Sequence, residues 1–242
     1  MSSTPPAQSQ AAAVLAAVLD VTAALPVEDA LIVESLAYST LQSGPEHQAW
    51  LASRKPRERR ISAEPVTVSR DGAGLAVRLN RPERRNAIDA ATRDALLDAF
   101  AIADADPALT VVWSGEGPSF CAGGDLDEFG TLSDPVSAHL IRTSRSLGAA
   151  VHRLRDRSTV LMHGACAGAG VELPAFAAKV IAEPGTTFLL PELSMGLIPG
   201  AGGTVSLPRR IGRDRTEQLA RRGTPIDTET ALEWGLIDEI RT

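Results

Sequence analysis

The sequence predicts an α/β fold, and two observations carry that prediction. After residue 65, short runs rich in β-branched residues alternate with longer stretches of helical periodicity, the pattern of a sheet covered by helices. The chain has 242 residues, of which 44% are hydrophobic. That is enough apolar material for one large folded domain.

The first part of the chain is predicted to be helical. Residues 1–10 are polar and contain proline, so we expect a disordered lead. Helices are expected over 11–20 and 27–42, and Ser43-Gly-Pro-Glu46 has the form of a capping box that opens a third helix through residue 53. The residues that recur near one face of the second helix are Val27, Leu31, Tyr38 and Leu41.

The predicted organisation has four parts: a lead at 1–10, a helical module at 11–56, a charged linker at 57–64 and a core at 65–242. A hairpin turns at Asp71-Gly-Ala-Gly74, and Asp89 is a good N-cap for a helix to about residue 103. Further strands are expected over 110–114, 159–164, 179–183 and 187–190, and helical segments over 136–155 and 215–241.

Composition and charge exclude several classes of function. The formal net charge is −6, which disfavours nucleic acid and anionic membranes as partners. The apolar run Ala11–Leu19 is too short to span a bilayer. Cys121 and Cys166 show no disulfide pattern, so a reduced, cytoplasmic setting is expected, and the four scattered histidines predict no metal site.

Two stretches share one layout, in which a strand leads through small residues into a helix. The first contains Ala122-Gly-Gly-Asp125 and the second contains Gly168-Ala-Gly170. Backbone N–H groups at such turns lack helical partners and lie in a positive local field. Either turn alone fits ordinary tight packing. Two of them could direct two N–H groups at one oxygen and form an oxyanion hole.

Two carboxylates lie in apolar surroundings next to these turns. Glu172 follows Gly170 inside the segment VELPAFAA, and Glu192 stands in LLPELSMGLIPGAGG. A charged group is costly to bury unless it is paired or used. The two glutamates are therefore candidates for an acid/base pair with tuned pKa values.

These segments resemble the crotonase, or enoyl-CoA hydratase/isomerase, superfamily from about residue 66 to residue 240. The resemblance rests on LNRPERRNAI, SFCAGGDLDEF, GACAGAGVELPAF, LPELSMGLIPGAGGTVSLPRRIG and ALEWGLIDEI in this order. It implies a spiral of ββα units, an acyl-CoA substrate without a separate cofactor, and assembly as a trimer or a dimer of trimers. The implied oxyanion hole uses the amides of Ala122 and Ala169.

The resemblance also implies a reaction. Glu172 activates water for attack at C3 of a 2-enoyl-CoA, and Glu192 delivers a proton to C2. Isomerases and other members of the family reuse this pair or parts of it, so isomerisation and other acyl-CoA chemistry stay open. A non-catalytic acyl-CoA-binding protein is a further alternative, against which the two glutamates argue.

The residues implied for coenzyme A come from both parts of the chain. Near the first turn they are Arg84, Arg85, Ala87, Asp125 and Leu126. The early segment PVEDALIVESLAYSTLQSGPEHQAWLASRKP is similar to the terminal helices of the family, which suggests a circular permutation. Under that hypothesis Trp50, Arg54 and Lys55 approach the adenine and phosphates, although Ser53 occupies the matching lysine position.

Overall fold

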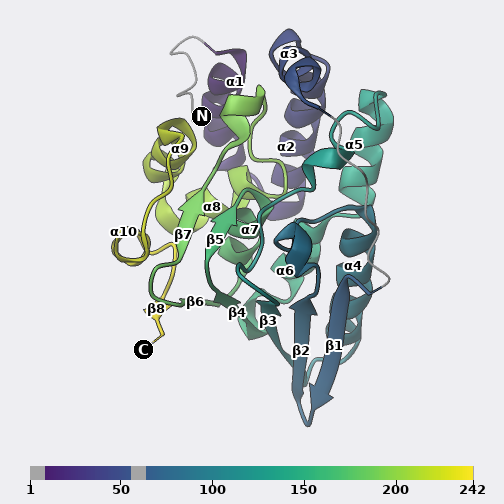
Figure 1. Cartoon of the computed structure of the whole chain (residues 1–242), viewed down its shortest axis with the longest axis vertical. Helices are drawn as coiled ribbons and strands as arrows, with labels where there is room; N and C mark the ends of the chain where they lie inside the picture. Colours follow the sequence, from purple (N-terminus) through teal and green to yellow (C-terminus); the bar gives the residue numbers. More distant parts are fainter. Residues whose placement is uncertain (1–8, 56–63, 242) are drawn as a thin grey trace.

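The structure is a computed structural model that describes residues 9–55 and 64–241. Its larger sheet has six strands in the order β1-β2-β3-β4-β6-β8, and only the β1–β2 pair is antiparallel (Figure 1). A second sheet pairs β5 with β7 in parallel. The strands are β1 Val66–Asp71, β2 Gly74–Leu79, β3 Thr110–Gly115, β4 Ser158–Met162, β5 Ala165–Ala167, β6 Lys179–Ala182, β7 Thr187–Leu189 and β8 Glu239–Ile240.

The α/β prediction is confirmed. Two pairs of consecutive strands are divided between the sheets: β4 and β6 belong to the larger sheet, and β5 and β7, which follow them, belong to the smaller one. The helices are α1 Gln10–Thr22, α2 Val27–Gln42, α3 Pro45–Ser53, α4 Ala90–Ala105, α5 Pro135–Ser144, α6 Leu147–Arg153, α7 Ala169–Glu172, α8 Gly203–Ile211, α9 Arg213–Arg222 and α10 Thr228–Trp234. Short 3₁₀ turns include η1 Pro82–Arg84, η2 Leu126–Glu128, η3 Arg155–Arg157, η4 Pro174–Phe176 and η5 Glu192–Met195.

Several local predictions need correction. The single helix expected over 136–155 is divided into α5 and α6, because the Ser146 hydroxyl accepts the Ala149 N–H at 3.2 Å and starts a new helix. The first 3₁₀ turn after Asp125 replaces the helix expected there. The helix α8 was not expected as a separate element.

The predicted capping box is wrong. The Ser43 hydroxyl bonds back to the Ser39 carbonyl, and Gly44 is the N-cap of α3. The Glu46 carboxylate instead accepts the backbone N–H groups of Gln10 and Ala11, at 2.7 and 3.2 Å. Glu46 therefore caps α1 from another helix and fixes α3 against its start.

The N-terminal helices pack on the core, at the end of the molecule opposite the tip of the β1–β2 hairpin (Figure 1). Leu15 and Leu19 of α1 are fully buried. The Thr22 hydroxyl donates to the Thr204 carbonyl at 3.0 Å, which joins α1 to α8. The expected lead ends earlier than predicted, since Ser9 is buried as the N-cap of α1, whereas residues 1–8 and most of the expected linker lie outside the described residues.

Candidate active site

Two adjoining cavities lie where the N-terminal helices meet the core. The larger cavity has a volume of about 470 Å³ and the smaller cavity about 250 Å³. Both predicted glutamates line the smaller cavity. The residues common to the two walls are Gln42, Ile88, Gly124, Glu128, Arg142, Ala169, Gly200 and Ala201. The cavities therefore share a junction near the two glycine turns.

The first glycine turn offers a different donor from the predicted one. The Ala122 N–H donates to the Arg85 carbonyl at 2.9 Å, so it is not available to a ligand, and its assignment is corrected. Ile88 forms a strand-like bridge with Gly124 by bonding to the residues on either side of it. The Ile88 N–H donates to the Gly123 carbonyl, and the Ile88 carbonyl accepts the Asp125 N–H, each at 2.8 Å. Within the described chain, the intervening N–H of Gly124 has no acceptor, and Gly124 lines both cavities.

The second glycine turn places its donor beside the first. Gly168 has φ +50°, a conformation that favours glycine, and Ala169 follows as the first residue of α7. No acceptor for the Ala169 N–H occurs among the described residues, and Ala169 lines both cavities. A Cβ on Gly123 would lie 3.6 Å from the Ala169 nitrogen, so the two turns are in contact.

Glu172 is buried at the end of α7 and is held by the start of α8. Its Oε2 accepts the backbone N–H groups of Ala201 and Gly203, at 2.7 and 2.9 Å. Burial raises the pKa of Glu172 well above its ordinary value, and the charges of Glu192 and Glu34 raise it further. The two N–H groups act in the opposite direction because they stabilise the carboxylate form.

Glu192 meets a different environment at the start of η5. Its Oε2 is buried and accepts no hydrogen bond within the described part of the chain. Its Oε1 lies 2.6 Å from the place where a Cβ on Gly168 would stand, so it approaches the second glycine turn closely. Burial raises the pKa of Glu192 to about 8. A carboxyl group in this setting holds its proton more tightly than an exposed glutamate does.

A third buried carboxyl group, Glu34 of α2, was missed by the sequence reasoning. Its Oε1 accepts the Gly202 N–H at 2.7 Å, and its Oε2 accepts the Thr204 N–H and hydroxyl at 2.9 and 2.7 Å. Glu172 takes the amides of residues 201 and 203, so the two carboxyl groups hold alternate N–H groups of one segment. Burial raises the pKa of Glu34 to about 7. Its position three residues after Leu31 was a readable signal, since it places Glu34 near the apolar face.

Tyr38 and Arg142 were also missed, and both line the smaller cavity. The Tyr38 ring lies against Gly200, where a Cβ would come within 2.2 Å of the ring. The Arg142 guanidinium lies over the same ring, 4.4 Å from its centroid. Burial raises the pKa of the Tyr38 phenol and lowers that of Arg142.

The residues predicted to bind coenzyme A form a connected surface beside the first glycine turn. Arg84 forms ion pairs with Asp125 and Asp127, so its charge is already balanced. Arg54 donates to the Leu126 carbonyl and also pairs with Asp127, and its guanidinium lies 4.9 Å from the centre of the Trp50 ring system. These contacts place the end of α3 beside the turn of its own chain.

The remaining predicted residues of this surface lie at its edges. Arg85 has a left-handed backbone conformation with φ 51°, and Ala87 is buried while its carbonyl accepts from Arg81. Lys55 is exposed at the end of the described N-terminal part. Over residues 9–55 and 64–241, no group of three His, Cys, Asp or Glu side chains could hold a metal ion.

Comparison with known sequences finds one family. A sequence model described as enoyl-CoA hydratase/isomerase matches residues 71–242. The mevalonyl-coenzyme A hydratase sidH of Aspergillus fumigatus is 32% identical over 167 residues, which cover 69% of this chain and 62% of that protein. The 2,3-dehydroadipyl-CoA hydratase of Escherichia coli is 32% identical over 176 residues, which cover 72% of this chain and 68% of that protein.

Comparison with solved structures also finds similarity to enoyl-CoA hydratases. The enoyl-CoA hydratase of Thermoplasma volcanium has a TM-score of 0.66 and 32% identity, covering 73% of this chain and 71% of that chain. The enoyl-CoA hydratase of Mycobacterium smegmatis has a TM-score of 0.66 and 26% identity, and the match covers 73% of this chain and 70% of that chain. The sequence-model match begins at residue 71, so helices α1, α2 and α3 lie outside it.

Proposed function

Because this chain belongs to the enoyl-CoA hydratase/isomerase family, we propose that it reversibly hydrates a 2-enoyl-CoA thioester to a 3-hydroxyacyl-CoA. The observation that carries the proposal is the smaller cavity, in which two buried glutamates adjoin two backbone N–H groups that have no acceptor among the described residues. Hydration needs these groups together: donors for the thioester oxygen, a base for water and an acid for carbon.

The thioester carbonyl binds at the two glycine turns. The N–H groups of Gly124 and Ala169 donate to its oxygen, which polarises the conjugated double bond and makes C3 electrophilic. Negative charge builds on the same oxygen as water adds. The two donors are fixed by the backbone before the reaction begins, so they stabilise this charge without reorganising.

The hydrogen bonds assign different roles to the two glutamates. A negative charge shared by the pair is more stable on Glu172, which accepts two backbone N–H groups, than on Glu192, whose Oε2 accepts none from the described residues. Glu172 is therefore the base that takes a proton from water as the oxygen attacks C3. Glu192 is the acid that gives its proton to C2, and the reverse steps dehydrate the product.

Isomerisation is a second candidate for the same site. It needs one group that removes a proton from one carbon of the acyl chain and returns it to another. Glu192 suits this task because burial raises its pKa to about 8 and no hydrogen bond from the described residues restrains its Oε2. A mere acyl-CoA binder has no use for two such carboxyl groups, since burying them costs stability.

The N-terminal helices close this site in the same chain, and we include them in the proposal as the counterpart of the family's terminal helices. Glu34 and Tyr38 of α2 reach the cavities, and Trp50 of α3 packs against Phe129 with 5.9 Å between ring centroids. Phe129 lines the smaller cavity. Coenzyme A is proposed to follow the surface from Asp125 and Leu126 towards Trp50, Arg54 and Lys55, together with Arg84, Arg85 and Ala87.

Setting and assembly belong to the same proposal. None of the described helices is long and apolar enough to cross a bilayer. Cys121 and Cys166 are unpaired and buried, which fits a reduced cytoplasm. We propose a homotrimer or a dimer of trimers that uses acyl-CoA thioesters and no separate cofactor.

Loss of enone absorbance with crotonyl-CoA tests the activity. Glu172→Gln and Glu192→Gln each remove one proton-transfer group while keeping the shape, and each should lower kcat by about 10²–10⁴-fold. Glu233→Gln, an exposed change outside both cavities, is the matched control and should retain activity. Wild-type protein that binds the thioesters but converts no 2-enoyl-CoA would reduce the chain to a binding protein.

A further inference from the structure

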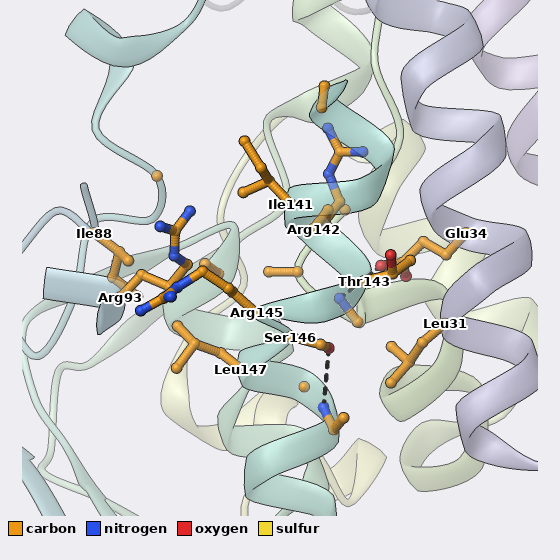
Figure 2. Close-up of a pocket in the computed structure, with 18 of the residues that line it drawn as sticks. Leu31, Glu34, Ile88, Arg93, Ile141, Arg142, Thr143, Arg145, Ser146 and Leu147 are labelled. Atoms are coloured by element: carbon orange, nitrogen blue, oxygen red, sulfur yellow. Dashed lines mark hydrogen bonds between the residues drawn. The ribbon is translucent and has the colours of Figure 1, made fainter. Parts of the chain in front are cut away.

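Arg142 is a partly buried cation that lines both cavities and that the proposed mechanism does not use. It comes from α5 and faces α2, and Figure 2 shows it beside Ile141, with Leu31 and Glu34 projecting from the opposite helix. Its guanidinium lies over the Tyr38 ring at 4.4 Å, and Tyr38 lines the cavity that holds the two catalytic glutamates. An acyl group bound at the glycine turns therefore shares a wall with Arg142.

The acceptors that Arg142 contacts within the described residues are all electrically neutral. Nη1 donates to the Ser35 carbonyl and to the hydroxyls of Ser35 and Ser39, at 3.3, 3.1 and 3.0 Å. Nη2 donates to Oε1 of Gln42 at 2.8 Å. Among the described residues, Nε has no hydrogen-bond acceptor, and no carboxylate forms an ion pair with this guanidinium.

The charged residues near Arg142 that are described next, Arg93, Arg145 and Glu34, already have polar partners of their own. Arg93 and Arg145 lie on another wall of the larger cavity (Figure 2). Both contact the carboxylate of Asp94 at 2.8 Å. Glu34 interacts electrostatically with Arg142, but its two oxygens accept hydrogen bonds from Gly202 and Thr204. In the part of the chain that the structure describes, Arg142 thus lacks the ion-paired carboxylate that Arg93 and Arg145 have.

A ligand carboxylate would complete this arrangement. Removing a guanidinium from water is costly, and neutral acceptors satisfy its N–H groups without neutralising its charge. The planar fork of arginine binds a carboxylate through two parallel hydrogen bonds, and the free Nε supplies one of the donors. Leu31, Ile88 and Leu147 give the larger cavity apolar walls for the carbon chain between the thioester and the carboxylate.

We propose that Arg142 binds a carboxylate carried by the acyl group, so that the substrate is the 2-enoyl-CoA of a short dicarboxylic acid. This inference rests on the proposed function, because it takes the acyl-CoA site as given. It adds what that function leaves open, the chemical class of the acyl tail.

Binding of two chain-matched, unreactive thioesters tests the inference without relying on turnover. Hexanoyl-CoA and adipoyl-CoA have the same number of carbons and differ only in the terminal carboxylate. Titration calorimetry of the wild-type protein should show about 10- to 100-fold tighter binding of adipoyl-CoA. Arg142→Met should bring the ratio of the two Kd values close to one, and Arg142→Lys, which keeps the charge without the fork, should retain part of it.

Two further variants test whether the preference for adipoyl-CoA depends on Arg142 and not on another arginine. Arg153→Met removes an exposed arginine that pairs with Asp104 outside both cavities, and it should keep the full ratio. If Arg145→Met abolishes the preference and Arg142→Met does not, the anion binds on the other wall and the assignment to Arg142 is wrong. Equal wild-type affinities also overturn the inference, and circular dichroism of each variant excludes unfolding as the cause.

Turnover separates this inference from the proposed function. If hexenoyl-CoA is hydrated as well as its carboxylated counterpart, the hydratase stands and the carboxylate subsite fails. If neither is hydrated but adipoyl-CoA still binds more tightly than hexanoyl-CoA, the subsite stands and the reaction is another one.

Discussion

Glu172 and Glu192 have the same side chain and opposite surroundings. Glu172 receives two N–H groups from the start of α8, whereas Oε2 of Glu192 accepts no hydrogen bond from the described residues. Both are buried, and burial raises the pKa of each. In the proposed mechanism, the base and the acid therefore differ in their hydrogen bonds, since residue type and burial are the same for both.

The raised pKa of Glu192 predicts a stability effect with a definite sign. The folded protein holds this proton more tightly than the unfolded chain, so the contribution to stability is complete below the ordinary value of 4.5 and is lost as pH rises through about 8. Glu192→Gln is neutral at every pH. Its Tm relative to wild type should therefore rise between about pH 5 and pH 9. A difference in Tm that stays constant across this range would contradict the raised pKa.

Glu34 gives a second prediction at this scale. Glu34→Gln leaves one carbonyl oxygen where two carboxylate oxygens served Gly202 and Thr204, and its new amide group faces N–H donors. The free energy of unfolding should fall by about 1–3 kcal/mol. The kcat should fall as well, because Glu172 is held by the alternate N–H groups of the same segment.

Thermal melts and crotonyl-CoA kinetics measure both effects of that change. Asp29→Asn on the same helix is the control, since Asp29 is exposed and lies outside both cavities. A Glu34→Gln protein with the Tm and kcat of wild type would show that this contact does not support the site.

The sequence predicted those site residues that stand out from their immediate neighbours in the chain. Glu172 stood out because its neighbours within one segment are apolar. Arg142 did not, because its contacts are with residues of α2, about one hundred positions earlier in the chain. The choice between the Ala122 and Gly124 N–H groups also required the structure, since it depends on which amide the strand-like contact at Ile88 leaves unpaired.

At the scale of elements, α8 and the segment before it connect the N-terminal helices to the chemistry. Alternate N–H groups of residues 201–204 are held by Glu172 from the core and by Glu34 from α2. The start of a helix favours negative charge, so one segment serves both carboxyl groups. Helix α2 is therefore joined directly to the segment that holds Glu172.

Removal of residues 1–56 tests this dependence. The truncation uncovers the apolar surface that Leu15 and Leu19 bury and removes Glu34 and Tyr38 from the cavities. We expect a loss of cooperative unfolding and of acyl-CoA binding, measured by circular dichroism and calorimetry. A truncated protein that melts and binds like the full chain would mean that α1, α2 and α3 are an independent extension.

Helices and strands were predicted well where the hydrophobic pattern extends over many residues, and poorly where it extends over few. The bounds expected for α2 are those observed, and the β1–β2 hairpin turns where expected. The strands β5 and β8 have only three and two residues, too few for a periodic signal, and they are defined by their partners β7 and β6. The helix expected over 136–155 is divided by the single cap at Ser146, which hydrophobic periodicity does not reveal.

At the scale of the whole molecule, assembly remains a prediction. Leu36, Val136 and Leu140, on the adjacent helices α2 and α5, are each more than half exposed, at 52%, 63% and 58%. Exposed apolar side chains on neighbouring helices are typical of subunit contacts. Sedimentation equilibrium should give the mass of a trimer or a hexamer, and a monomer at micromolar concentration would contradict this expectation.

Mass spectrometry in water labelled with oxygen-18 measures whether the proposed reaction adds water to the double bond of a 2-enoyl-CoA. The proposed reaction predicts a product heavier than the substrate by one water, with the label on the hydroxyl at C3. It also predicts that Glu172→Gln slows the appearance of that label about 10²–10⁴-fold. A product of unchanged mass, whose double bond has moved, would instead establish an isomerase.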